Sequence, residues 1–198
     1  MPSVSTATKR TEARTHMIGV LRSAYSGELA AAWAYRGHWR SLRNPAEREA
    51  IARIEREEWE HRAVVLRMLR SVDAKPQRLR DAWMRGVGIS VAGACFVIGR
   101  FFSMYFAGRL ESSNIAEYVD GAMSARILGR IADERAFEHM ARIEAENERF
   151  FRDAVEGHPL LPAMQRVFPW PMSTALERAA FTPRGVDVNA LAGAGHAE

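Results

Sequence analysis

The sequence predicts an all-α protein, an antiparallel four-helix bundle with an apolar crossover helix and a short C-terminal helix. Three observations support this fold class. Ala, Arg, Glu and Leu dominate the 198 residues, and runs of β-branched residues are short. Turn signals divide most of the chain into long helical segments. A pair of spaced glutamate motifs also occurs twice, once in each half of the chain. The length is sufficient for one domain with a sizeable core.

The first two helices are expected over residues 12–41 and 45–71. The second has a clear start, because Asn44 is a favourable N-cap, Pro45 suits the first helical position and Glu47 is placed to complete a capping box. The short connection before Pro45 makes these two helices antiparallel neighbours.

The middle of the chain is unusually apolar. Residues 86–99 carry no charge, and glycines stand at positions 86, 88, 93 and 99. The helical region from about Leu79 to Leu128 is too long for one helix of a compact bundle. We therefore expect a crossover helix followed by a core helix over 99–128. Gly129 then marks a turn, and a last bundle helix is expected over 131–155.

The sequence divides into a disordered tail at 1–16, the bundle at 17–156, a Pro-rich extension at 157–182 with a short helix around 173–180, and a disordered tail at 183–198. The formal charge of +4 is modest and does not predict nucleic-acid binding. The single cysteine, Cys95, excludes an internal disulfide and fits a reducing compartment. The polar N-terminal segment lacks an apolar signal core, so a cytoplasmic location is expected.

The duplicated motif indicates a metal site. Glu28 is followed 30 residues later by Glu58-x-x-His61, and Glu111 is followed 33 residues later by Glu144-x-x-Asn147. A Glu on one helix and a Glu-x-x-His on its neighbour form half of a di-iron site in a four-helix bundle. At ~1.5 Å rise per residue, each Glu lies at a height similar to that of its partner motif.

Two alternatives remain at this stage. Glu117 competes with Glu111 for the position on the third bundle helix, and the sign of the height offset favours Glu111. A single Glu-x-x-His on a charged helix is usually a solvated face, whereas the spaced duplication favours metal binding. Carboxylates and imidazole are suitable ligands for iron, and four Glu side chains carry enough charge for two divalent ions.

Tyr35 and Tyr118 are a second repeated feature of the two halves, since Tyr35 follows Glu28 by seven residues and Tyr118 follows Glu111 by seven. Two helical turns place each Tyr on the face of its Glu. The simpler interpretation is a core aromatic residue whose hydroxyl is satisfied. The functional interpretation is a hydrogen-bond donor behind the metal ligands, or a barrier lining an oxygen pocket.

These residues resemble a known family. The segment GELAAAWAYRG, with Glu28, Tyr35 and Gly37, resembles the first metal helix of the demethoxyubiquinone hydroxylases, which are ferritin-like di-iron monooxygenases of ubiquinone synthesis. Glu58-x-x-His61 is similar to their second metal helix. The stretch from Trp83 to Glu111 resembles their crossover and third metal helix. The resemblance covers roughly residues 20–153 and is more specific for the fold than for the substrate.

The resemblance implies roles for these positions. Glu28 and His61 would bind one iron, with Glu58 bridging, and Glu111 would bind the other, with Glu144 bridging. Asn147 replaces the expected His. Three outcomes are open: a complete site with Asn147, water or another side chain as ligand, a site with one weakly held metal, or a bundle without metal. A divalent metal other than iron is a further option.

Other residues that could replace the missing histidine at position 147 are less favoured as ligands. Glu148 lies on the face of Glu144 but is better explained as a solvated partner of Arg152. His139 lies on a different face. His38 and His158 are interpreted as surface or loop histidines.

We therefore expect an O2-activating, hydroxylase-like oxidoreductase with two iron ions, acting on a hydrophobic, quinone-like substrate. The alternatives are a non-catalytic ferritin-like bundle that binds a lipid or protein partner, and an iron-oxidising or peroxide-scavenging protein. The apolar crossover is either a core helix, or a surface that contacts the inner face of a membrane or a quinone channel. A homodimer is compatible with the sequence. The residues that would line the channel are Phe101, Phe102, Met104, Tyr105 and Phe106.

Overall fold

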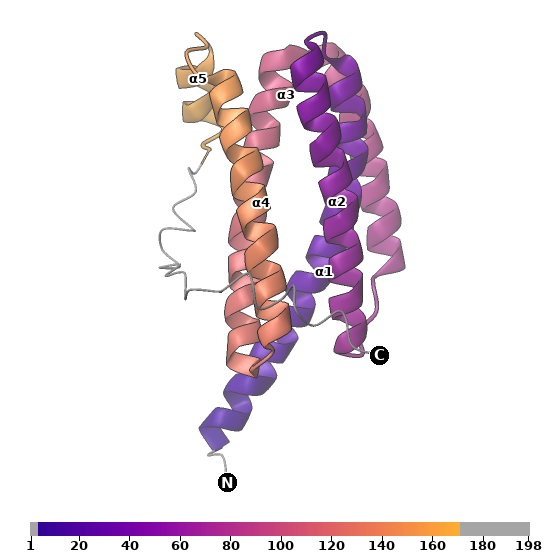
Figure 1. Ribbon diagram of the computed structural model, residues 1–198, viewed down its shortest axis with the longest axis vertical. Helices are drawn as coiled ribbons and strands as arrows, with labels where there is room; N and C mark the ends of the chain where they lie inside the picture. Colours follow the sequence, from indigo (N-terminus) through magenta and orange to yellow (C-terminus); the bar gives the residue numbers. More distant parts are fainter. Residues whose placement is uncertain (1–3, 171–198) are drawn as a thin grey trace, which may run out of the picture.

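The computed structural model of the protein describes residues 4–170. This part of the chain is helical and contains no strand, which confirms the all-α fold class. Its helices are α1 (Val4–Ser41), α2 (Pro45–Ser71), α3 (Arg78–Leu128), α4 (Ile131–Val155) and α5 (Leu161–Val167). In Figure 1 the four long helices run along the same axis, and α5 lies at the end where α4 finishes.

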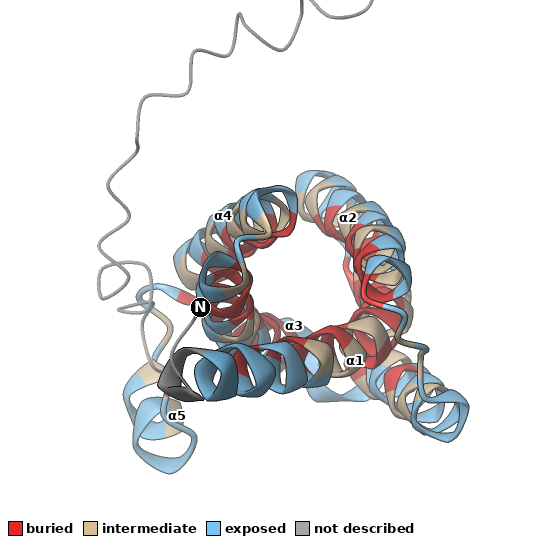
Figure 2. Ribbon diagram, turned by 90° about the horizontal axis from the view of Figure 1, so that it is seen from below, coloured by how far each residue is buried: buried red, intermediate tan, exposed pale blue. Residues whose placement is uncertain are grey.

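Helices α1 to α4 surround a common core. Figure 2 shows their buried residues facing inward around a ring. The apolar core is divided into two clusters. One contains Met17, Leu21, Val65, Ile115 and Met140, and the other contains Tyr35, Ile54, Met104, Tyr105 and Phe151. On every bundle helix, the predicted metal-site positions fall between these two clusters in sequence.

The long helix α3 is broken at Gly99. This residue has φ 80° and ψ 169°, in the region that favours glycine, so α3 consists of a first half over 78–98 and a second half over 100–128. In Figure 1 the first half rises on the outside and the second half descends beside α4. The break confirms the expected crossover followed by a core helix.

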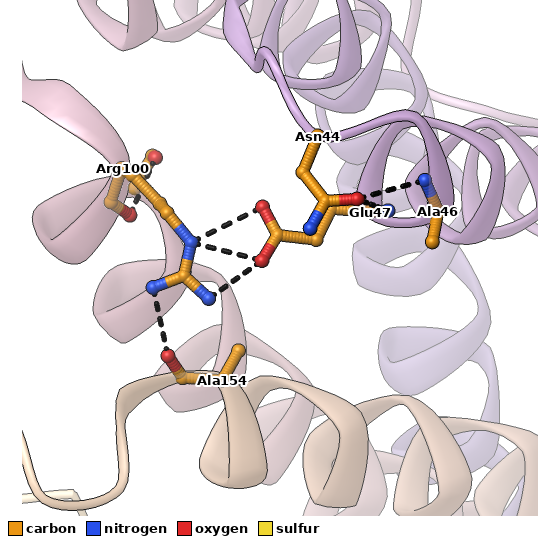
Figure 3. Close-up of polar contacts among 6 residues, drawn as sticks. Asn44, Ala46, Glu47, Arg100 and Ala154 are labelled. Carbon is orange, nitrogen blue, oxygen red and sulfur yellow. Dashed lines mark hydrogen bonds and ion pairs between the residues drawn. The ribbon is translucent and has the colours of Figure 1, made fainter.

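Arg100 fixes the geometry directly after this break. Its guanidinium donates to both carboxylate oxygens of Glu47 at the start of α2, and to the Ala154 carbonyl near the end of α4 (Figure 3). Asn44 caps α2 as expected, since its Oδ1 accepts from the Ala46 N–H at 2.9 Å. The Glu47 carboxylate is therefore used to hold α3 rather than to complete a capping box.

The first half of α3 packs closely on α1. A Cβ atom added at Gly37 would lie 2.4 Å from Ala92 Cα, and one added at Gly88 would lie 2.4 Å from the Ala30 carbonyl oxygen. The opposite faces of this segment are open, because Trp83, Phe96 and Val97 are exposed. The first half of α3 is thus not a core helix.

Of the two interpretations left open for the residues after the break, core packing agrees with the structure for three of them. Phe101, Met104 and Tyr105 are buried within the second apolar cluster, while Phe106 is exposed. Their main role in the fold is core packing, because the second half of α3 is a bundle helix with α4 beside it.

The start of α1 differs from the expectation. The helix begins at Val4 rather than near residue 12, so residues 4–16, expected as a tail, are helical. Ala13 and Met17 are buried, and the Arg10 guanidinium donates to the Ile127 and Leu128 carbonyls at the end of α3. These contacts extend the helix, since they satisfy carbonyls that the end of α3 leaves without partners.

Helix α4 covers 131–155 as predicted, and Gly129 adopts φ 71° in the turn before it. The C-terminal extension contains α5 at Leu161–Val167, where no helix was expected. Pro162 lies in the first turn of α5, a position where proline starts a helix rather than breaking it. The helix expected around 173–180 and the tail expected at 183–198 lie outside the described residues.

The contact between α1 and the first half of α3 can be tested with two alanine substitutions. Gly37→Ala should lower the free energy of unfolding by about 1–3 kcal/mol, because its Cβ would overlap the α3 backbone. Gly93→Ala, on an exposed part of the same α3 segment with open space around it, should raise it by up to about 1 kcal/mol through helix propensity. Urea denaturation of both variants measures the difference. Equal effects would contradict the close packing.

Candidate metal centre

The structure brings the six predicted site residues into one buried layer of the bundle. None of them is more than 3% exposed. Each long helix contributes at least one of them, at the height between the two apolar clusters. They are Glu28 on α1, Glu58 and His61 on α2, Glu111 on α3, and Glu144 and Asn147 on α4.

Four of these side chains are close enough to share a metal ion. Glu28, Glu58, His61 and Glu144 each offer one ligand atom, and these atoms all lie within 4.8 Å of one another. His61 Nδ1 is 3.0 Å from Glu144 Oε1 and 4.0 Å from Glu28 Oε2. The imidazole of α2 therefore faces carboxylates from both α1 and α4.

The two tyrosines connect the halves of the site crosswise. Tyr35 on α1 donates its hydroxyl hydrogen bond to Glu111 on α3, and Tyr118 on α3 donates to Glu28 on α1. Both rings are buried in the apolar clusters. Each Tyr is therefore both a core aromatic residue with a satisfied hydroxyl and a hydrogen-bond donor to a predicted metal ligand. Each Tyr pairs with the Glu of the opposite helix rather than its own.

Glu111, and not Glu117, reaches this layer. The Glu111 carboxyl faces that of Glu144 and accepts from Tyr35. Glu117 is only partly buried, and its carboxylate is hydrogen-bonded to Ser23. The choice of Glu111 over Glu117, which was based on the sign of the height offset between helices, therefore agrees with the structure.

Burial controls the protonation of the carboxyl groups. Desolvation, followed by repulsion between neighbouring carboxylates, raises the pKa of Glu58 and Glu111 well above the ordinary value. Desolvation likewise raises the pKa of Glu28, and it raises that of Glu144 to about 8. Desolvation lowers the pKa of His61, so its imidazole is preferentially neutral. A neutral imidazole is the form that binds metals.

The donor atoms of this layer fit divalent cations. Both oxygens of Glu58 and of Glu144 have no hydrogen-bond donor, and the nitrogens of His61 lack a well-directed partner. One oxygen each of Glu28 and Glu111 is also without a donor. Buried carboxylates without partners are costly, and cations between them would remove that cost. Four carboxylates and one imidazole match the ligand types expected for iron.

The half of the site at Asn147 differs from the other half. Asn147 Nδ2 donates to Glu57 Oε2 at 3.3 Å, while its buried Oδ1 has no partner. Glu148 does not replace the missing histidine, because its carboxylate accepts from Arg152 and from the Trp170 indole. Glu148 is indeed the partner of Arg152, but it is buried rather than solvated.

The remaining histidines lie outside this layer. His139 is exposed. His38, expected near the surface, is instead buried beside the rings of Tyr35 and Phe151, with its ring nearly parallel to both and its Nε2 unpartnered. His38 follows Tyr35 by three residues, and this helical spacing could have indicated that both side chains lie on the same inward face. Sequence reasoning also missed Glu57, for which the pattern gives no signal.

Comparisons with known proteins agree with this geometry. The family model described as "Ubiquinone biosynthesis protein COQ7" matches residues 15–175. A protein of Burkholderia multivorans named 3-demethoxyubiquinol 3-hydroxylase is 27% identical over 181 residues, which cover 91% of this chain and 85% of that protein. A Burkholderia lata protein of the same name is 25% identical over 163 residues, covering 82% and 77% of the two chains. No solved structure matches the chain.

The raised pKa values predict how the stability of the metal-free protein depends on pH. Buried Glu residues favour protonation in the folded state, so the stability they contribute is complete below 4.5 and is lost as pH rises towards about 8, the range set by Glu144. The lowered pKa of His61 acts oppositely, because its contribution is present above 6.5 and is lost as pH falls. Because four carboxyl groups oppose one imidazole, the net stability of the metal-free protein should fall as pH rises.

The free energy of unfolding with chelator present should therefore be greater near about pH 5 than near about pH 8. Divalent metal should reverse this order, because the ions displace the protons and bind more tightly as pH rises. Urea denaturation at both pH values, with chelator and with Fe²⁺ under anaerobic conditions, measures the effect. A metal-free protein that is more stable at the higher pH would contradict the carboxyl pKa shifts.

Proposed function

The chain belongs to the family of the ubiquinone biosynthesis protein COQ7, and we propose on this premise that it is a di-iron hydroxylase acting on a quinone-like ring. The observation that supports this most strongly is the buried layer of four carboxylates and one imidazole, in which most of the potential ligand atoms have no hydrogen-bond partner within the described chain. The name 3-demethoxyubiquinol 3-hydroxylase, carried by its relatives, supports the same class of substrate.

In this proposal each half of the layer binds one iron. Glu28 and His61 would hold the first ion, Glu111 would hold the second, and Glu58 and Glu144 would be available to both. When bound, the irons supply the activation of O2 that the protein side chains cannot perform. Asn147 belongs to the second half, which lacks an imidazole.

The protein's own groups orient these ligands. Tyr118 and Tyr35 donate to the Glu28 and Glu111 carboxylates, and each hydrogen bond fixes one carboxylate oxygen so that the other faces the interior of the site. The apolar clusters on either side exclude water from the layer. The carboxyl protons favoured by burial must leave as the metals bind.

A hydrophobic substrate also needs a route from a lipid phase. Helix α3 is long and apolar enough to cross a membrane by length and composition, and only 28% of its most apolar part is buried. The break at Gly99 and the ion pair of Arg100 with Glu47 argue against a continuous spanning helix. We therefore propose peripheral contact, with the exposed residues Trp83, Phe96 and Val97 in the apolar part of an inner membrane surface.

The activity can be tested with iron-loaded protein, a reductant, O2 and a short-chain demethoxyquinol. The expected product contains one additional oxygen atom, detected by mass spectrometry. His61→Ala should lower the rate by about a hundredfold or more, since even changes behind the ligands cost 10–100-fold. Glu60→Ala, an exposed position on the same helix, should retain the activity. Less than one iron per chain after anaerobic loading, or peroxide turnover without hydroxylated product, would disprove the proposal.

A separate prediction concerns the asymmetry of the site. Asn147→His should tighten binding of the second iron by about tenfold or more, because imidazole is a better ligand for iron than a neutral amide oxygen. Anaerobic Fe²⁺ titration of wild-type and variant protein against a chromophoric chelator measures the second binding constant. An unchanged second constant would show that position 147 does not contact the metal.

A further inference from the structure

The environment of Asn147 suggests how this chain compensates for the missing histidine. Asn147 lies three residues after Glu144 on α4 and is fully buried. Its Nδ2 donates to Glu57 Oε2 on α2, and its Oδ1 is buried without a hydrogen-bond partner. Within the described chain, this oxygen is the only part of the amide left for a ligand.

The orientation of the amide determines what it can bind. An amide nitrogen carries two N–H groups and no free lone pair, whereas the amide oxygen has two lone pairs. If the nitrogen faced the metal layer, the side chain would repel a cation. A carboxylate accepts hydrogen bonds only, so Glu57 can hold the nitrogen end but not the oxygen end.

Glu57 is itself held in place. Its Oε1 accepts from the Arg53 guanidinium at 2.6 Å, one helical turn earlier on α2. Its Oε2 is used by Asn147. Both carboxylate oxygens therefore have donors, so Glu57 is suited to orient another ligand rather than to bind a metal directly.

We infer that Glu57 is a positioning residue that turns the Asn147 oxygen towards the second metal, so that Asn147 serves as an oxygen ligand where the duplicated motif has histidine. This inference rests on the proposed di-iron function. In this arrangement the Asn147 amide oxygen takes the place of an imidazole, and Glu57 on the neighbouring helix sets its direction. A carboxylate orients a metal-bound histidine in the same way.

The consequence is a chemically asymmetric centre. The first metal has the His61 nitrogen among its ligands. The second would have only oxygen ligands, drawn from Glu111, Glu144, Glu58 and Asn147. Oxygen ligands favour harder cations, so the second position should hold its ion less tightly than the first.

The test is anaerobic titration of metal-free protein with Fe²⁺ alone, using a competing chromophoric chelator to obtain two binding constants. Glu57→Leu removes the hydrogen-bond acceptor and one negative charge. Glu60→Leu removes the same charge from an exposed position on α2 and serves as the matched control. Glu57→Leu should weaken the second constant by about 10–100-fold. Glu60→Leu should change it by no more than about two- to threefold.

A double-substitution cycle separates positioning from a structural effect. In an Asn147→Leu background, Glu57→Leu should weaken the second constant no further, because the ligand it orients is absent. Thermal melting of the metal-free variants reports folding. If Glu57→Leu does not fold, Glu57→Ala compared with Glu60→Ala repeats the measurement with less bulk.

Four outcomes would overturn the inference. Equal weakening by the changes at 57 and 60 would show that charge alone matters. A further loss from Glu57→Leu in the Asn147→Leu background would show that Glu57 acts on another group. Two tight irons in wild type with an unchanged second constant in Glu57→Leu would overturn the inference but leave the proposed function intact. Wild type that binds no Fe²⁺ would overturn both.

Discussion

The structure depends on burying four carboxyl groups in one layer of a helical bundle. Glu28, Glu58, Glu111 and Glu144 lie between two apolar clusters, where water cannot solvate their charges. Within residues 4–170, the hydroxyl donors to these carboxylates are those of Tyr35 and Tyr118, which reach the two carboxylates on α3 and α1. The remaining charge must be balanced by protons or by cations. This is why protonation, metal binding and folding are linked in the protein.

The same layer joins α2 and α4, whose backbones approach each other much less than those of the pairs α1 with α2, α1 with α3, and α3 with α4. Helices α3 and α4 approach closely, since a Cβ at Gly121 would lie 2.6 Å from the Phe137 ring, and α1 meets α3 at Gly88. Helices α2 and α4 share far less backbone proximity. They are connected through His61 with Glu144 and through Glu57 with Asn147. Changes in the site should therefore affect the spacing of α2 and α4, since few other contacts hold these two helices together.

Much of the fold and the layer of site residues could be predicted because helical periodicity is regular. Equal distances from the turns place Glu residues at equal heights, whatever surrounds them. The pairing of each Tyr with the opposite Glu could not be predicted, because it depends on how α1 and α3 are rotated against each other. The early start of α1 depends on contacts of Arg10 with residues more than a hundred positions away. The role inferred for Glu57 requires knowing that it faces α4, and burial of His38 requires knowing that Phe151 covers it.

Helix α1 links the site to the apolar outer surface. Glu28 and Tyr35 point into the bundle, while Ala30 and Gly37 lie against the first half of α3 on another face of the same helix. The absence of side chains at Gly37 and Gly88 keeps that segment close to α1 and directs Trp83, Phe96 and Val97 outward. Those three side chains face away from α1, so a hydrophobic molecule held against them would be separated from the carboxylate layer by the first half of α3 and by α1, about two helix diameters or roughly 20 Å. A substrate of the proposed kind would therefore have to pass beside both the first half of α3 and α1, or enter through an end of the bundle. At the end beside Arg100, entry is opposed by the ion pair of Arg100 with Glu47 and by the packing of the second apolar cluster.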